Sequence, residues 1–76
     1  MRKYENVPGY SLLTEEQKQL LKETNRRHQR AWESEKKKAE HSVEQMKKVE
    51  WDRQEKCLKV YYEKDWYHYS LDGSWY

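Results

Sequence analysis

The residues of this chain that could bind a metal ion or act as a nucleophile are its three histidines and its single cysteine. They are His28, His41, His68 and Cys57. Zinc sites usually draw such ligands from paired spacings such as C-x-x-C or H-x-x-x-H, and no such pair occurs here. A nucleophilic cysteine needs a histidine fixed beside it, and the strand pattern described below places Cys57 only diagonally from His68. We therefore expect no metal, no cofactor, no small-molecule substrate and no enzymatic activity.

The aromatic residues near the end of the chain are the main candidates for a binding surface. If residues 56–76 form strands, alternation places four ring-bearing side chains on the face away from the core: Tyr61, Trp66, His68 and Trp75. Exposed apolar patches usually mark interfaces, and Trp and Tyr are enriched at binding hot spots. We predict that this group binds another protein. The open alternatives are that the N-terminal segment covers it or that two copies of the chain meet there.

A second candidate surface is basic. Residues 22–30 carry one acidic residue, Glu23, and four basic residues: Lys22, Arg26, Arg27 and Arg30. Such a patch could contact phosphates or an acidic partner, although a solvated helix face has the same composition. The net charge of +2 and the pI of about 8.6 are too weakly basic to indicate nucleic acid by themselves.

The basic residues are predicted to lie on one long helix. Thr14 and Gln17 have the spacing of a capping box, which marks a helix start. Apolar residues then recur with the helical period as far as Val49. Because the phase does not reset, we predict a single helix over about 14–48, in preference to two antiparallel helices that meet near residues 25–28.

The period changes from 3.6 to 2 after residue 48, which predicts strands. Asp72-Gly73 is a strong turn, and Lys64-Asp65 is a possible two-residue turn. Residues 49–76 are therefore expected to form an antiparallel meander of three to four strands. The inner face of this sheet would collect Val49, Trp51, Leu58, Val60, Tyr62, Tyr67, Tyr69, Leu71 and Tyr76.

The sequence as a whole predicts one small domain of the α+β class. It would consist of an extended segment (1–13), an amphipathic helix (14–48) and a β-meander (49–76) packed on that helix. Because short strands cannot cover so long a helix, part of its apolar stripe should pack on the N-terminal segment 4–12, on a second copy or on a target, and we favour the second copy or the target. That part comprises Leu20, Leu21, His28 and Trp32.

The expected function is that of a small non-enzymatic protein-binding module, such as an inhibitor, adaptor or regulator. By analogy, phages and mobile elements encode proteins of this kind. A single cysteine forms no internal disulfide, and no stretch has the apolar length of a signal peptide or membrane span. These features predict a cytoplasmic protein without membrane contact, and a homodimer is one possible form. The alternatives are a nucleic-acid-binding protein and a self-assembling structural protein.

Overall fold

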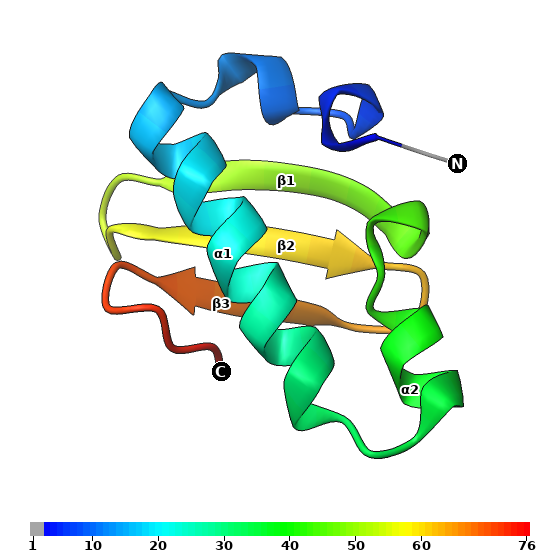
Figure 1. Cartoon of the computed structure of the whole chain (residues 1–76). Helices are drawn as coiled ribbons and strands as arrows, with labels where there is room; N and C mark the ends of the chain where they lie inside the picture. Colours follow the sequence, from blue (N-terminus) through cyan, green and yellow to red (C-terminus); the bar gives the residue numbers. More distant parts are fainter. Residues whose placement is uncertain (1–2) are drawn as a thin grey trace.

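A helix of seventeen residues lies across one face of a three-stranded antiparallel sheet (Figure 1). The structure is a computed structural model and describes residues 3–76. The sheet has the order β1-β2-β3, so the predicted α+β fold with a meander is confirmed. The elements are the 3-10 helices η1 (Tyr4–Asn6), η2 (Tyr10–Leu12) and η3 (Val43–Gln45), the helices α1 (Glu15–Ala31) and α2 (Glu35–Glu40), and the strands β1 (Met46–Asp52), β2 (Cys57–Tyr62) and β3 (Trp66–Ser70).

Helix α1 begins where the capping box predicts. The Thr14 hydroxyl accepts a hydrogen bond from the Gln17 backbone N–H at 3.2 Å. The Gln17 side-chain oxygen accepts in return from the Thr14 N–H at 3.0 Å. Two donors of the first turn are therefore satisfied by side chains, and Glu15 and Glu16 lie near the positive end of the helix dipole.

The predicted C-terminal end of the helix over 14–48 is wrong, because α1 ends at Ala31. Trp32 has an extended backbone, and its ring stacks on His41 at 4.9 Å. Ser34 then caps α2, which returns beside the end of α1, where the Gln29 side chain donates to the Lys38 carbonyl. The later apolar residues Val43, Met46 and Val49, from η3 and β1, pack into the same core as α1, whereas α2 buries none of its residues.

The N-terminal segment was predicted to be extended, and it instead forms two short 3-10 turns against the edge of β1. Its apolar side chains Val7, Tyr10 and Leu13 are buried in the core. The Val49 N–H donates to the Pro8 carbonyl at 3.0 Å. Gly9 has a φ of 92°, and an added Cβ there would lie 2.0 Å from the Val49 carbonyl oxygen, so only glycine fits this approach.

The strand register differs from the prediction by two residues. Val60 lies opposite Tyr67, because the β2–β3 connection is longer than a two-residue turn at Lys64-Asp65. A shift of two residues leaves every side chain on its predicted face, since strand side chains alternate with period two. Five inner-face residues of the prediction are accordingly found on the side of α1: Leu58, Val60, Tyr62, Tyr67 and Tyr69.

The pairing of residues 74–76 with β3 differs from the predicted pairing by one residue. This difference places two side chains on the opposite face of the sheet from the one predicted. Ser70 N–H donates to the Ser74 carbonyl, and Gly73 with a φ of 87° closes a three-residue loop in place of the predicted two-residue turn. Trp75 therefore faces inward and stacks on His28 at 5.1 Å, whereas Tyr76 faces outward. The predicted faces of Trp75 and Tyr76 are both wrong, and Leu71 lies exposed in the loop.

The core between α1 and the sheet contains a buried network of polar groups centred on Asn25. The two N–H groups of the Asn25 side-chain amide are shared among three acceptors within hydrogen-bond distance: the Tyr62 hydroxyl at 3.0 Å, the Tyr69 hydroxyl at 3.3 Å and the His41 carbonyl at 3.0 Å. Its oxygen accepts from the Tyr4 hydroxyl at 2.9 Å. Buried polar groups are costly without partners, and here one amide serves four segments of the chain.

His28 belongs to the same buried layer and is fully enclosed by rings. Its Nδ1 lies 2.9 Å from the Tyr69 hydroxyl, and its Nε2 has no hydrogen-bond partner within residues 3–76. Burial, reinforced by the nearby His41, lowers the pKa of His28 from 6.5 to about 4, against the opposing effect of Asp65. The ring is therefore neutral at pH 7.

Replacing Asn25 with alanine is expected to lower the free energy of unfolding by about 3 kcal/mol. The change removes the Asn25 hydrogen bonds to the His41 carbonyl and the Tyr4 hydroxyl, whereas the Tyr62 and Tyr69 hydroxyls keep each other as partners. Each unmade bond costs about 1–3 kcal/mol. Urea denaturation followed by circular dichroism measures the loss. Gln19→Ala on the exposed side of α1 is the control and should stay within about 0.5 kcal/mol of the wild type. A loss below about 1 kcal/mol for Asn25→Ala would contradict the central role of this amide.

The depressed pKa of His28 predicts acid destabilisation. Between pH 6.5 and 4 the unfolded chain binds a proton on His28 that the folded chain does not bind, so stability falls as the pH falls through this window. The total loss is about 3 kcal/mol, from 1.36 kcal/mol per pKa unit. Unfolding curves at pH 7 and pH 4 should show this loss in the wild type and in His68→Gln. In His28→Gln, the loss of unfolding free energy between pH 7 and pH 4 should be smaller than in the wild type by about 3 kcal/mol. An equal loss in His28→Gln and the wild type would show that other groups cause the acid destabilisation.

Candidate functional site

The face of the sheet opposite α1 carries a row of rings, the outer aromatic row, formed by Tyr61, Trp66, His68 and Tyr76. The Tyr61 and Trp66 rings stack at 5.6 Å with an interplanar angle of 17°. Trp66 and His68 lie 4.8 Å apart, and His68 stacks on Tyr76 at 4.6 Å and 7°. Of the predicted binding residues, the structure brings together Tyr61, Trp66 and His68, and it replaces Trp75 with Tyr76.

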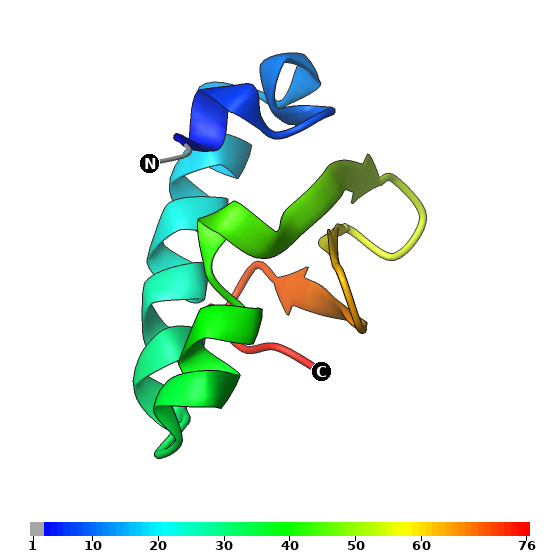
Figure 2. The ribbon, with the colours of Figure 1, turned by 90° about the vertical axis from the view of Figure 1, so that its right-hand side faces the viewer.

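This face is open to solvent. In the side view of Figure 2, α1 and α2 lie on one side of the sheet, and the N-terminal segment lies beyond the edge formed by β1. The N-terminal segment therefore does not cover the outer aromatic row, which removes one alternative of the sequence analysis. Trp66 is 49% exposed and is one of the large hydrophobic side chains that lie outside the core.

The charges around the row are balanced in pairs. Lys48 lies over the Tyr61 ring at 5.5 Å and pairs with Glu50 at 3.3 Å. Lys59 pairs with Asp52 at 3.0 Å. The Tyr61 hydroxyl donates to Glu50 at 3.4 Å. The surface therefore combines apolar rings with acidic and basic groups of both signs.

Three potential metal ligands meet at one end of the row: Glu55, Cys57 and His68. Their nearest ligand atoms all lie within 4.8 Å of one another. The Glu55 carboxylate is 3.3 Å from His68 Nε2 and 3.8 Å from the Cys57 sulfur. Burial, together with the charges of Glu55 and Asp52, raises the pKa of the Cys57 thiol. The sequence analysis missed this group because its members come from a turn and two strands.

The predicted helix interface is not free. Leu21 and His28 are fully buried, and Leu20 packs at the border of the core. Trp32 is half-buried against His41. The stripe is occupied by the chain's own sheet because α1 is much shorter than the predicted helix.

The predicted basic patch lies on the other layer of the molecule. Arg26, Arg27 and Arg30 are exposed on α1, which covers the inner face of the sheet. The Lys22 ammonium group lies over the Tyr10 ring, 5.9 Å from the ring centroid. Within residues 3–76 none of the three arginines has an ion-pair partner, so they remain a solvated cationic surface remote from the outer aromatic row.

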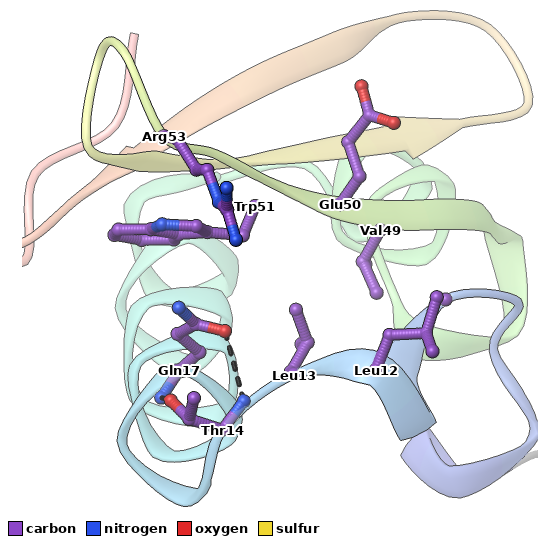
Figure 3. A pocket seen from close by; sticks show the side chains of 9 residues that line it. Leu12, Leu13, Thr14, Gln17, Val49, Glu50, Trp51 and Arg53 are labelled. Atoms are coloured by element: carbon purple, nitrogen blue, oxygen red, sulfur yellow. Dashed lines mark hydrogen bonds between the residues drawn. The ribbon is translucent and has the colours of Figure 1, made fainter.

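An open groove of about 490 Å³ separates the start of α1 from the edge of β1 (Figure 3). Leu12, Leu13 and Val49 lie at one side of the groove, and Trp51 and Arg53 lie at the other. Leu12 is 87% exposed. The lining includes one carboxylate, that of Glu50, and one hydroxyl, that of Thr14, which caps α1. The groove is lined by Gly9, Leu12, Leu13, Thr14, Gln17, Val49, Glu50, Trp51 and Arg53.

Comparison of the chain with known protein families, with characterised proteins and with solved structures found no match. Across residues 3–76, no helix combines the length and the apolar character needed to cross a membrane. The functional argument therefore depends on the geometry of the chain itself.

Native Cys57 is expected to react slowly with iodoacetamide. Its thiol is buried, burial and the nearby Glu55 and Asp52 charges raise the thiol pKa, and only the thiolate is nucleophilic. Tyr76→Ala should accelerate alkylation, measured by mass spectrometry over time, because it removes a ring that lies beside the buried thiol. Tyr61→Ala, at the far end of the outer aromatic row, is the matched control and should leave the rate unchanged. Equal rates for the wild type and Tyr76→Ala would show that Tyr76 does not protect the thiol.

Proposed function

We propose that this chain is a small non-enzymatic protein-binding module whose contact surface is the outer aromatic row. The observation that carries the proposal is the stacked pair of half-buried Tyr61 and exposed Trp66, on the one sheet face that no helix covers. Tryptophan and tyrosine at the centre of a surface, with charged groups around them, are typical of binding hot spots.

The charge arrangement favours a protein over a nucleic acid as the partner. Nucleic-acid surfaces that stack bases also supply free cations for the phosphates. Here Lys48 and Lys59 are each paired with an acid, the unpaired Arg26, Arg27 and Arg30 lie on the layer of α1, and Arg53 lines the groove beside β1. A strand of nucleic acid stacked on Tyr61 and Trp66 would pass over Glu50 and Asp52. The rings and the basic patch therefore support no common nucleic-acid path.

The role consistent with this surface is that of an inhibitor, adaptor or regulator in a reducing compartment such as the cytoplasm. A chain that buries so little aliphatic material gains stability from anything that binds only its folded form. A phage or mobile-element origin agrees by analogy with the size of the chain. A second copy of the chain is a further partner that the same surface could contact.

The first experiment identifies and then measures the partner. The tagged chain is used to capture proteins from the native host, and the dissociation constant for each captured protein is measured by calorimetry. Trp66→Ala and Tyr61→Ala should each weaken binding by at least about 30-fold, which corresponds to about 2 kcal/mol. Neither change should alter the circular dichroism spectrum, because both rings lie outside the core.

Leu12→Ala is the matched control, because it also removes an exposed apolar side chain but lies in the groove beside β1. Full binding by Trp66→Ala with loss in Leu12→Ala would transfer the contact to that groove and contradict the proposal. Tight, salt-dependent binding of single-stranded DNA or RNA would favour the nucleic-acid alternative. A concentration-dependent oligomer in sedimentation that Trp66→Ala abolishes would make the partner a second copy.

A further inference from the structure

We propose that Glu55, Cys57 and His68 form a binding site for a zinc ion. A carboxylate, a thiol and an imidazole are the three ligand types that zinc takes in proteins. They come here from the β1–β2 turn, the start of β2 and the middle of β3. Thiolate and imidazole together select zinc over the oxygen-seeking ions magnesium and calcium.

The distances between the ligand atoms already approach those of a tetrahedral zinc site. Zinc bonds of about 2.0–2.3 Å at tetrahedral angles give edges of about 3.3 Å between nitrogen and oxygen and about 3.6 Å between sulfur and oxygen. The observed separations are 3.3 Å from His68 Nε2 to Glu55 and 3.8 Å from the Cys57 sulfur to Glu55. The third edge, from Cys57 to the His68 ring, is within 4.8 Å and needs a closure of at most about 1.3 Å to reach the tetrahedral edge of about 3.5 Å.

The His68 ring is oriented as in a metal ligand. Its Nδ1 lies 3.4 Å from the Tyr76 carbonyl oxygen, which is an acceptor, so Nδ1 carries the proton. Metal-bound histidines commonly donate their second N–H to a carbonyl in this way. In the neutral ring, Nε2 then presents its lone pair to the Glu55 carboxylate oxygen, an arrangement that a cation between the two atoms would stabilise. A protonated His68 would stabilise the same arrangement as a simple ion pair, and the experiment below separates the two.

The turn between β1 and β2 brings Glu55 back over Cys57. Asp52 accepts hydrogen bonds from the Gln54 and Glu55 N–H groups at 2.9 and 3.0 Å, which fixes the first half of the turn. Lys56 has a φ of 55°, and this left-handed residue reverses the chain between the two ligands. A non-glycine residue in this conformation is uncommon, and here it lies directly between Glu55 and Cys57.

The site would have three protein ligands and one water. The Glu55 side chain is 54% exposed, so an ion can enter from the solvent side of the turn. Tyr76 stacks on His68 beside Cys57, and it limits the remaining space. On binding, the Cys57 thiol releases one proton to solvent and bonds as thiolate. Thiolate and carboxylate together then neutralise the two charges of the ion.

The site is independent of the proposed protein-binding function. His68 belongs to both the zinc site and the outer aromatic row, but the ligands Glu55 and Cys57 do not belong to the row, and Tyr61 and Trp66 do not belong to the site. Zinc binding is measured on the chain alone, without any partner. Because the two tests change different residues and use different readouts, failure of one proposal is distinguishable from failure of the other.

The experiment adds cobalt chloride or zinc chloride to the reduced, metal-free chain at near-neutral pH. Cobalt(II) bound to a thiolate gives a sulfur-to-metal charge-transfer absorption, and the chain should bind one equivalent with this signature, which zinc then displaces. Cys57→Ser should lose the absorption completely, since no other cysteine exists. Glu55→Gln should weaken zinc binding at least about tenfold by calorimetry, in line with the 10–100-fold losses seen on disturbing zinc sites.

Glu63→Gln is the matched control, because Glu63 is an exposed acid near the opposite end of β2 and should leave zinc binding unchanged. Zinc should also raise the unfolding temperature of the wild type but not that of Glu55→Gln. Glu55→Gln changes only an exposed turn residue, so its fold is not in question. Absence of the charge-transfer absorption, or equal zinc affinity in the wild type and Cys57→Ser, would overturn the proposal and leave Glu55 and His68 as an ion pair only.

Discussion

The hydrogen bonds of the buried Asn25 amide are the constraint on which the rest of this structure depends. Isoleucine and phenylalanine are absent from the chain, so tyrosines fill the space that aliphatic side chains occupy in other cores. A tyrosine brings a hydroxyl that must find a partner when buried. Asn25 supplies that partner to Tyr62 and Tyr69 and accepts from Tyr4. One side chain of α1 thus fixes the helix against two strands and the N-terminal segment, and it makes the sheet register costly to change.

The arrangement of rings on the outer face of the sheet depends on the length of the loop between Ser70 and Ser74. The three-residue loop closed by Gly73 places the chain one residue out of the expected phase, and Trp75 then completes the ring layer around His28. Tyr76 then faces outward, where it stacks on His68 and lies beside Cys57. A two-residue turn would have reversed both side chains, because a one-residue slip exchanges the faces of a strand. The aromatic row and the cover of the thiol therefore have the same origin.

Local signals in the sequence were sufficient for some parts of the fold and insufficient for others. The Thr14 capping box located the start of α1, and period-two alternation identified the inner residues of β2 and β3 even though the register was two residues off. The end of α1 could not be read from the apolar spacing, because Val43 of η3 and Met46 and Val49 of β1 keep the phase of the helix and pack into the same core. The Glu55, Cys57 and His68 cluster was missed because strand pairing brings its members together and no local motif does. A spacing of two between an acid and a cysteine after a polar turn, with a histidine on the next strand, is the weak signal that was present.

The sheet has only one packed layer, and this asymmetry explains why its outer face carries both candidate sites. A domain of this size buries only about 60% of its unfolded surface, and α1 with the N-terminal segment has already used the inner face. Rings stacked in pairs and ion pairs such as Lys59–Asp52 give the outer face some order without a second layer. Exposed ion pairs contribute at most about 1 kcal/mol each, so they stabilise this face little. A ligand that binds only the folded state would contribute more. Zinc at Glu55, Cys57 and His68 would tie the β1–β2 turn to β3, and a protein over Tyr61 and Trp66 would cover the row. Each would act where the chain itself provides no second layer.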